Sequence, residues 1–402
     1  MRRKLKVLII TFMYPNKLNP KSGIFIKNQY DLLRKDFNLK IIFPYPYVPK
    51  IKFLNPFHRF SAIPEKEIVE GIEVYHPKYL SIPKNRFTFK FISLVNIIEG
   101  LLSYISARRV INGIYKKWKF DIIKVHGCAT ESFLAVLTKK KYGKPLIVVL
   151  HGEDINYFAK LALLKPLSRW ILSNADQIIV KCKSQIEEAF KIGIKDHKFH
   201  IIPSGYAVKR FFPVSKATSR KKLNIPSSKK IILFVGALIK RKAVEYLIMA
   251  ARDIIKKNQN VLIYIVGDGP EKANLEKLSQ KLGVEDSVYF AGEKKPDEVP
   301  LWMNACDLLV LPSLSESLAN VLSEAMACGK PVVATRVAGS PDIVNRDVGY
   351  LIRTRDPKDL ASKVNLAIKR KWSRKKLLRR AREFSVIKSV QDTADIYRKL
   401  AR

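Results

Sequence analysis

The sequence is poor in cysteine, with four cysteines scattered at positions 128, 182, 306 and 328 of 402 residues. No two of them form a Cys-x-x-Cys pair or a spacing typical of a metal site. This excludes a disulfide-stabilised scaffold and a zinc ribbon, and it indicates a reducing compartment. We expect all four thiols to be small apolar side chains of the interior.

Long apolar runs are also absent. No stretch approaches the roughly 20 apolar residues of a membrane span, and the run from Phe91 to Ile98 is interrupted by Asn96. The N-terminus, Met1 to Ile10, has the basic start and apolar run of a signal peptide, but no small-residue cleavage site follows it. We therefore expect Lys6–Thr11 to be a first strand and the protein to be cytoplasmic.

Acidic residues are few, because 75 Lys and Arg stand against 35 Asp and Glu, a formal net charge of +40. This excess is far larger than solubility requires and favours an anionic partner. Nucleic acid is one such partner, although no zinc-finger, RNA-recognition or helix-turn-helix signature supports it. An anionic membrane is another. A lysine-rich genome or a thermophilic origin would explain the same charge without any partner.

Apolar residues make up 47% of the chain, enough for two full cores, and the length exceeds the usual single domain of about 100–200 residues. Apolar strand-like runs alternate with amphipathic helical ones, which is typical of parallel sheets with crossover helices. The expected strands are Lys6–Thr11, Leu39–Pro44, Ile122–Val125, Leu146–His151, Gln177–Lys181, Ile231–Val235, Val261–Val266, Val288–Phe290, Leu308–Leu311 and Val332–Ala334. The polar, basic stretch from Arg210 to Pro226 is interpreted as the domain linker.

A strand leads into a helix around position 312. Pro312 ends the apolar run before it, the serines at 313, 315 and 317 are all good helix caps, and Asn320–Ala327 is a helix that Gly329 closes. The free backbone N–H groups and the dipole at such a helix start both favour an anion. This junction is therefore a candidate phosphate site.

Two glutamates, Glu316 and Glu324, lie eight residues apart across this junction. Eight helical residues rise about 12 Å, whereas a glycoside hydrolase holds its two carboxyls about 5–9.5 Å apart. The pair is better suited to the two ends of a long ligand, with a diphosphate over the helix start between them. The alternative is that both are solvated glutamates on a helix face.

The stretch from Glu316 to Thr335, Glu-x7-Glu followed by Ala-Met-Ala-Cys-Gly-Lys-Pro-Val-Val-Ala-Thr, resembles the signature of the family 4 retaining nucleotide-sugar glycosyltransferases. Other segments resemble the family's motifs in the right order: Tyr14 to Ile26, Val148 to Asp154, Ala175 to Ser184, Ile202 to Gly205, Val235 to Lys242 and Val266 to Pro270. The resemblance implies an α/β fold with two Rossmann-like domains whose parallel sheets face a central cleft, the GT-B architecture. It implies an acceptor-binding domain over 1–204, a donor-binding domain over 205–375, and a C-terminal helix over 376–402 that crosses back to the first domain.

The resemblance also implies roles for single residues. The donor-binding residues are Gly23, Gly236, Arg241, Lys242, Glu316, Asn320 and Glu324, and the catalytic residues are His151, Lys242 and Glu316. Glu324 would accept hydrogen bonds from the ribose and Glu316 from the sugar, while Lys242 neutralises the departing diphosphate. Asp154 is either a sugar contact or a helix cap, and His151, which would contact the transferred sugar, is otherwise a structural histidine.

The sequence departs from the family pattern at two places. The position after Gly236, where the family often has arginine, is Ala237, and Ala243 replaces the usual glycine after the lysine. Arg241 could compensate for the missing arginine. The family's Gly-Phe-Pro is Ser317-Leu-Ala319 here, so we expect a differently shaped loop.

The resemblance implies a hexosyltransferase of polysaccharide biosynthesis that moves a sugar from a UDP or GDP donor, with retention, to a glycan or lipid-linked acceptor. The sequence contains no Asp-x-Asp, so we expect no metal and no other cofactor. A non-hydrolysing nucleotide-sugar epimerase and a phosphorylase share the architecture. A basic nucleic-acid-binding protein is the alternative from another class, although we expect no nucleic acid as a partner. A dehydrogenase is disfavoured, because Gly267–Glu271 lacks the third glycine and a spaced acidic partner.

One basic segment predicts where a membrane would bind. Between positions 84 and 119, eight basic residues and one acid, Glu99, surround apolar helical material. A basic helix with an apolar face is typical of contact with anionic lipid. The expected contacts are Lys84, Arg86, Lys90, Arg108 and Arg109. We therefore expect a peripheral protein of the inner face of the cell membrane.

Overall fold

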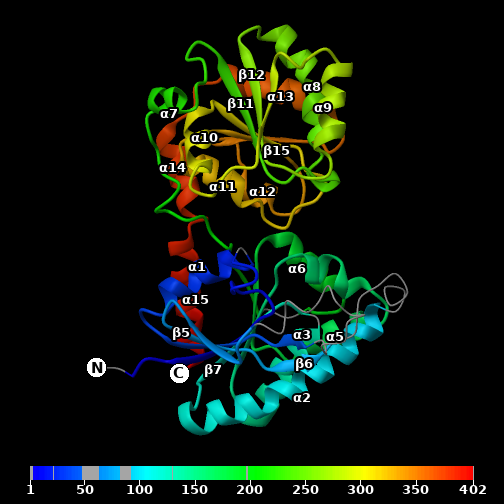
Figure 1. Cartoon of the computed structure of the whole chain (residues 1–402), viewed down its shortest axis with the longest axis vertical. Helices are drawn as coiled ribbons and strands as arrows, with labels where there is room; N and C mark the ends of the chain where they lie inside the picture. Colours follow the sequence, from blue (N-terminus) through cyan, green and yellow to red (C-terminus); the bar gives the residue numbers. More distant parts are fainter. Residues whose placement is uncertain are drawn as a thin grey trace. The chain divides into compact units, whose positions relative to one another are not determined.

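The computed structural model describes residues 3–20, 22–47, 63–81, 92–128, 130–195 and 198–401. The chain divides into two compact units, Met1–Ile202 with Ser389–Arg402, and Pro203–Lys388. Each unit is a mainly parallel sheet with helices on both faces (Figure 1). This is the expected α/β fold with two Rossmann-like domains.

The first unit contains an eight-stranded sheet in the order β10-β9-β8-β7-β1-β2-β5-β4 and a two-stranded sheet of β3 and β6. The strands are β1 Lys6–Ile10, β2 Asn38–Ile42, β3 Tyr45–Tyr47, β4 Lys66–Val69, β5 Ile72–Tyr75, β6 Lys78–Leu80, β7 Ile122–His126, β8 Leu146–Val149, β9 Gln177–Val180 and β10 Phe199–Ile201. All neighbours in the large sheet are parallel except β4 and β5. The central strands read as continuous apolar runs because helices cover both of their faces.

The helices of the first unit are α1 Ile24–Leu33, α2 Ile92–Trp118, α3 Thr130–Tyr142, α4 Glu153–Asn156, the 3-10 turn η3 Phe158–Lys160, α5 Leu164–Ser173 and α6 Lys183–Lys191. Alternate residues of β1 serve two separate cores. Leu8 and Ile10 pack in the core that α2 and α3 cover, whereas Val7 and Ile9 pack in the core that α1 covers. This division follows from the two-residue period of a strand.

The second unit is a six-stranded, fully parallel sheet in the order β13-β12-β11-β14-β15-β16. Its strands are β11 Lys230–Val235, β12 Val261–Val266, β13 Val288–Gly292, β14 Leu308–Leu311, β15 Val332–Thr335 and β16 Gly349–Ile352. Its helices are α7 Lys216–Lys222, the 3-10 turn η4 Lys240–Lys242, α8 Val244–Lys257, α9 Lys272–Lys281, α10 Val299–Ala305, α11 Asn320–Ala327, α12 Ser340–Ile343, α13 Pro357–Lys369 and α14 Arg374–Arg382. Each of the strands expected from the sequence is present in the two units.

The last helix, α15 Val386–Leu400, carries the chain into the first unit. The change of unit occurs at residue 389 rather than at 376, because α14 packs against α11 and contributes Leu377 and Ala381 to the core of the second unit. Within the first unit, the ring of Tyr397 meets that of Phe37 edge to face, with centroids 5.1 Å apart.

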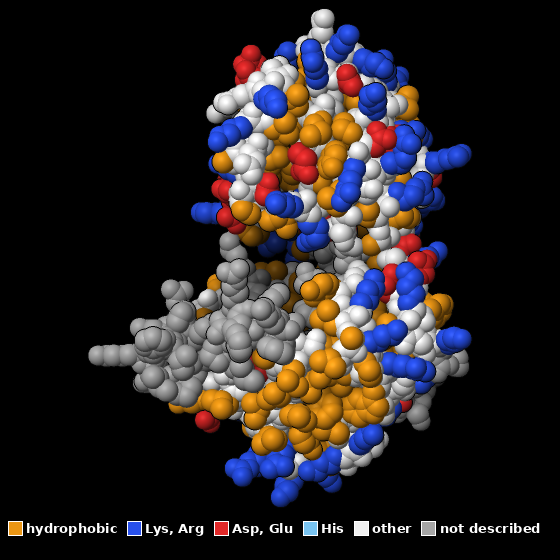
Figure 2. Space-filling view, turned by 90° about the vertical axis from the view of Figure 1, so that its right-hand side faces the viewer, with side chains coloured by type: hydrophobic (Ala, Val, Ile, Leu, Met, Phe, Trp, Pro, Cys, Tyr) orange, Lys and Arg blue, Asp and Glu red, His pale blue; other side chains and the backbone are white. Residues whose placement is uncertain are grey.

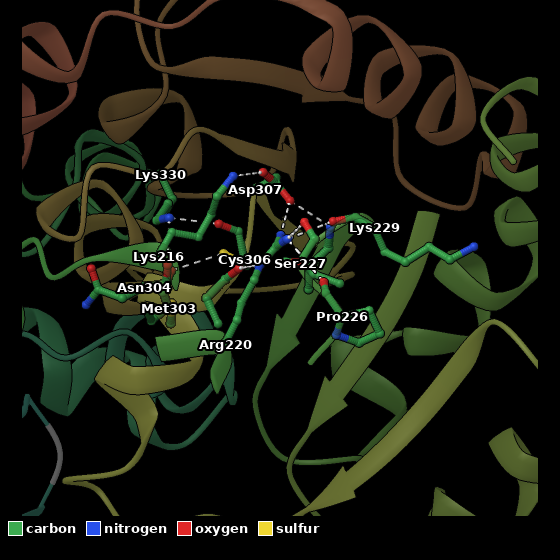
Figure 3. A network of polar contacts seen from close by, with 12 residues as sticks. Lys216, Arg220, Pro226, Ser227, Lys229, Met303, Asn304, Cys306, Asp307 and Lys330 are labelled. Carbon is green, nitrogen blue, oxygen red and sulfur yellow. Dashed lines mark hydrogen bonds and ion pairs between the residues drawn. The ribbon is translucent and has the colours of Figure 1, made fainter. Parts of the chain in front are cut away.

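The stretch from Arg210 to Pro226 is not a free linker, and that interpretation is wrong. It contains α7, whose cap is Ser215, and the Arg220 side chain of this helix is 4% exposed. Arg220 donates to the carbonyls of Ala305, Ser227 and Lys229 and pairs with Asp307 at 2.6 Å (Figure 3). The basic composition of the stretch misled the prediction, because one of its charges is a buried structural donor.

Candidate active site

Three donors surround the carboxylate of Glu316 in the second unit. The Lys242 ammonium lies 2.5 Å from Glu316 Oε1, and the Ser313 hydroxyl donates to the same oxygen at 2.7 Å. Arg241 reaches Oε2 at 3.5 Å and the carbonyl of Ser315 at 3.0 Å. Glu316 is only 7% exposed. The structure thus brings together Lys242, Arg241 and Glu316, three residues to which the family resemblance gives a role in donor binding.

The helix α11 begins at Asn320, shortly after Glu316 in the sequence. The residue at the N-cap position is Ala319, whose side chain cannot accept a hydrogen bond from the first turn of the helix. The expectation of a serine at this position is therefore wrong. Among the residues that the structure describes, the backbone N–H groups of Asn320 and Val321 have no acceptor. Ser313 instead binds Glu316. The helix start is therefore an uncapped group of donors with a positive dipole end.

Glu324 lies on α11, one turn before its end. Burial raises the pKa of this carboxyl to about 7, and the more distant charge of Arg210 lowers it only in part. Within the described part of the chain Glu324 has no hydrogen-bond partner. The residue is half-buried and its carboxyl oxygens are not fully enclosed by the protein, so this carboxyl is open to a partner and is a candidate for binding a ligand.

Gly236 follows β11, where the ends of two strands approach too closely for side chains. A Cβ on Gly267, at the end of β12, would lie 1.9 Å from the carbonyl oxygen of Gly236. A Cβ on Gly269, with φ of +156°, would lie 2.4 Å from the carbonyl of Leu238. The Gly-x-Gly sequence here packs one loop against another, which is a structural reason for both glycines.

Ala243 keeps the backbone conformation that the family's glycine would adopt. It has φ of 52° and ψ of 42°, in the left-handed region, at the junction between η4 and α8. Such a conformation costs an alanine about 1–2 kcal/mol. Next to Lys242, an alanine therefore occupies a turn that glycine would adopt at lower cost.

Gly23 of the first unit precedes α1 with φ of +61°. A Cβ at this position would lie 2.5 Å from the carbonyl oxygen of Met13. The glycine is therefore required by both the backbone conformation and the space, and its amide lies at the start of a helix.

Asp154 lies within α4, shortly after β8. Its carboxylate accepts from the backbone N–H groups of His151, Gly152 and Ile155, at 2.8–3.1 Å. Burial is the largest influence on its pKa and raises it, while these backbone bonds act in the opposite direction. The carboxylate thus holds the backbone around the start of α4, although Asp154 is not the residue that precedes this helix.

His151 forms a hydrogen bond that sequence reasoning missed. Its Nε2 lies 2.7 Å from Nδ1 of His126, the last residue of β7, and the two rings are stacked. Burial, together with the charges of Lys181 and Lys124, holds the pKa of both imidazoles well below its usual value. Burial likewise lowers the pKa of Lys124 to about 7 and that of Lys181 to about 8. The position of His126 at the carboxyl end of a strand next to that of His151 could have indicated the pair.

The predicted membrane contacts are described in part. Lys84, Arg86 and Lys90 lie outside the described residues, and Arg108 and Arg109 are exposed on α2. Four apolar residues at helical spacing on the same helix are 36–51% exposed: Leu94, Ile98, Leu101 and Ile105. Figure 2 shows a face of the first unit on which apolar side chains gather, with lysines and arginines at its edge. None of the helices that the structure describes has the length and apolar character needed to cross a membrane.

In the described ranges, no three His, Cys, Asp or Glu side chains come together as metal ligands. All four cysteines are buried, as expected for small apolar side chains of the interior.

Two family models match successive parts of the chain. The glycosyl transferases group 1 model matches residues 215–384, and the Glycosyltransferase Family 4 model matches residues 61–210. Together they cover most of both units.

The chain is similar to individual glycosyltransferases. It is 27% identical to TuaC of Bacillus subtilis (strain 168), provisionally assigned to teichuronic acid biosynthesis, over 90% of this chain and 88% of that protein. It is 29% identical to the N-acetyl-alpha-D-glucosaminyl L-malate synthase of Bacillus anthracis, over 67% of this chain and 71% of that protein.

Solved structures share the fold. The sucrose-phosphate synthase of Thermosynechococcus elongatus superposes with a TM-score of 0.72 at 20% identity, over 99% of both chains. HepE of Anabaena in complex with UDP superposes with a TM-score of 0.70 at 17% identity, over 98% of this chain and 100% of that one.

Proposed function

This chain belongs to the family 4 glycosyltransferases of GT-B fold, and from that premise we propose that it transfers a hexose from a nucleotide-diphosphate sugar with retention of configuration. The observation that supports this most directly is the unpaired carboxyl of Glu324, four residues after the uncapped start of α11. Two ribose hydroxyls would supply the hydrogen bonds that this carboxyl lacks. The diphosphate would then meet the free amides of Asn320 and Val321.

The proposed mechanism is electrostatic. A nucleotide-sugar bond breaks as negative charge moves onto the β-phosphate, so the site must stabilise that charge more in the transition state than before it. Lys242 and the start of α11 would supply this stabilisation, with Arg241 beside them. Lys242 is held 2.5 Å from Glu316 Oε1, which fixes its position before the donor arrives. Glu316 would bind the sugar through Oε2, which Arg241 approaches only to 3.5 Å.

We further propose that the site operates without a metal ion. The positive charge that a divalent ion would supply comes instead from Lys242, Arg241 and the helix start. The absence of Asp-x-Asp from the sequence supports this.

For the donor, UDP-sugars are the first candidates. UDP and UDP-glucose bind HepE of Anabaena, whose fold this chain shares, and GDP-sugars stay as the second class. Calorimetry against a panel of UDP- and GDP-sugars, with the Glu324→Gln variant in parallel, tests the proposal. Binding of one sugar nucleotide that the variant loses supports it, and no binding of any member of the panel would contradict it.

For the acceptor, we propose a lipid-linked or cell-surface glycan precursor that is reached at an anionic membrane. The support is α2, whose exposed stripe is apolar from Leu94 to Ile105 and basic from Arg108 onward, ending in Lys116 and Lys117. Apolar side chains enter the acyl boundary while the cations bind lipid phosphates, each worth about 1 kcal/mol near the surface. The similarity to TuaC, provisionally assigned to teichuronic acid biosynthesis, is in keeping with a cell-envelope acceptor.

A radiolabelled-donor assay distinguishes the transferase from the two other enzymes of this architecture. The transferase releases a free nucleotide diphosphate and labels an extractable acceptor. An epimerase would leave the sugar on its nucleotide, and a phosphorylase would need inorganic phosphate.

A further inference from the structure

Three aromatic side chains of the first unit form a hydrogen-bonded chain that ends at His151. The hydroxyl of Tyr30 on α1 lies 2.5 Å from Nε2 of His126 at the end of β7. Nδ1 of His126 lies 2.7 Å from Nε2 of His151, which follows β8. Tyr30 is 0% exposed and His126 is 4% exposed, so water competes with neither bond.

The first bond has a single direction. Among the described residues, His126 is the only hydrogen-bond partner of the Tyr30 hydroxyl. Because a buried hydroxyl needs an acceptor for its proton, and burial raises the pKa of Tyr30 well above its usual value, Tyr30 donates. Nε2 of His126 therefore accepts and carries no proton.

The second bond follows from the first. His126 stays neutral because it is buried near two lysines, Lys124 and Lys181, whereas the carboxylate of Asp154, which acts on Lys181, is bound to backbone amides. A neutral imidazole has one N–H, which in His126 must be at Nδ1. It donates to Nε2 of His151, and the proton of neutral His151 is then at Nδ1.

We propose that Tyr30 and His126 are positioning residues that hold His151 as its Nδ1–H tautomer. In the part of the chain that the structure describes, this N–H has no partner, and the ring is half-buried against Phe25. His151 would thus offer the substrate a fixed hydrogen-bond donor, suited to a hydroxyl or carbonyl oxygen, and would take up no proton. The role toward substrate rests on the proposed function; the tautomer does not.

The proton positions can be measured on the ligand-free, full-length protein labelled with ¹⁵N. Long-range ¹H–¹⁵N correlation spectra distinguish protonated from unprotonated ring nitrogens, and loss of one set of signals in His151→Gln assigns the residue. We expect His126 and His151 both to be protonated at Nδ1. His200, whose Nε2 faces the Gln177 side-chain oxygen at 2.5 Å, should show the opposite tautomer and is the internal control. A proton at Nε2 of His151 overturns the proposal.

Two pairs of variants test the positioning role. His126→Asn keeps an N–H close to the position of Nδ1, whereas His126→Leu has a similar size and no donor. We expect His126→Leu to lower kcat about 5- to 10-fold, the scale of one lost hydrogen bond, and His126→Asn to restore most of it. Tyr30→Phe should leave His126 in mixed tautomers and weaken the Nδ1–H signal of His151. Equal kcat values for His126→Asn and His126→Leu would refute the role, and so would an unchanged His151 spectrum in Tyr30→Phe. Calorimetry with sugar nucleotides reports separately whether the proposed function fails.

Discussion

The ammonium group of Lys242 lies 2.5 Å from Oε1 of Glu316, and both side chains are largely shielded from water. In the ligand-free protein, the cation proposed to hold the diphosphate is thus bound to the carboxylate proposed to hold the sugar. Each group keeps the other in place, so that removing one changes the stability of the protein as well as its activity.

Replacing Lys242 should therefore have two separable effects. Lys242→Ala should lower transfer at least about 100-fold, the scale of one lost electrostatic stabiliser. It should also destabilise the second unit by about 3 kcal/mol, because Glu316 loses its ion pair in a buried site. In Lys242→Met/Glu316→Gln, stability measured by urea unfolding should recover while activity does not. Lys240→Ala, at an exposed neighbouring lysine, is the control and should change neither. Near-normal transfer by Lys242→Ala at saturating donor would show that the assigned role is wrong.

Glu324 should make stability depend on pH. The pKa of this carboxyl in the folded protein, about 7, exceeds the usual value of about 4.3. Between these two pH values, the folded protein therefore carries a proton on Glu324 that the unfolded chain has released. The resulting stability is fully present below pH ~4.3 and is lost as pH rises through ~7. The neutral Glu324→Gln variant should therefore have the same melting temperature as the wild type at pH 4.5. At pH 8 its melting temperature should be higher, because its free energy of unfolding should exceed that of the wild type by about 1–3 kcal/mol.

The same variant should bind the donor at least about 10-fold more weakly, since a hydrogen bond to a charged group is lost. A difference in melting temperature that does not change with pH would mean that this carboxyl is not the titrating group. Undiminished donor affinity would mean that it does not contact the ribose.

Gly23 should tolerate no side chain. Gly23→Ala combines a left-handed backbone with a Cβ placed 2.5 Å from a carbonyl oxygen, whereas Gly143, in the same unit with φ of +62°, has nothing within 4 Å. Both variants carry the backbone cost of about 1–2 kcal/mol, and Gly23→Ala should lose about 1–3 kcal/mol more from overpacking. Thermal unfolding of the two variants measures this difference. Equal losses of stability would show that the loop containing Met13 moves aside and makes room for the Cβ.

The exposed stripe of α2 should bind anionic vesicles. Replacing Ile98, Leu101 and Ile105 with serine removes apolar side chains that are 36–51% exposed, so the fold should stay intact. Co-sedimentation with vesicles containing anionic lipid should fall about 10-fold or more. Lys375, Arg379 and Arg382 on α14, replaced with glutamine, give the control for diffuse charge. If the control loses as much binding as the α2 variant, the net charge rather than α2 is responsible.

Chelation should leave transfer unchanged. A site that takes its positive charge from Lys242, Arg241 and backbone amides needs no divalent ion. Dialysis against EDTA, followed by assay with and without Mg²⁺ or Mn²⁺, measures this. Loss of activity that either ion restores would contradict the metal-free site.

The long, central elements could be predicted because their patterns are complete in the sequence. The helix Asn320–Ala327 and its neighbouring strands have the expected bounds, or nearly so, since Pro312 and Gly329 mark the ends. The strands β4 and β5 were missed, because Lys66–Val69 and Ile72–Tyr75 contain charged residues and form no continuous apolar run. Tertiary pairing rather than local pattern makes them strands.

The candidate site shows the same limit. Glycines and charged residues at strand ends could be identified, whereas the partners of His151 could not. His126 lies 25 residues before His151, and Tyr30 lies 96 residues before His126. Only the order of strands in the sheet brings these residues together. The buried role of Arg220 likewise depends on the carbonyls of Ala305, at the end of α10, and of Lys229, just before β11.

The course of α15 has a consequence for synthesis of the protein on the ribosome. The second unit is one continuous stretch, Pro203–Lys388, but the first unit includes both ends of the chain. Tyr397 packs on Phe37 and lies over the Lys124 ammonium, with Nζ 5.5 Å from its ring. A nascent chain therefore has every residue of the second unit before it can finish the first. The first unit is synthesised first but completes its fold last. If translation stops before residue 389, the core of the first unit stays accessible to chaperones and proteases.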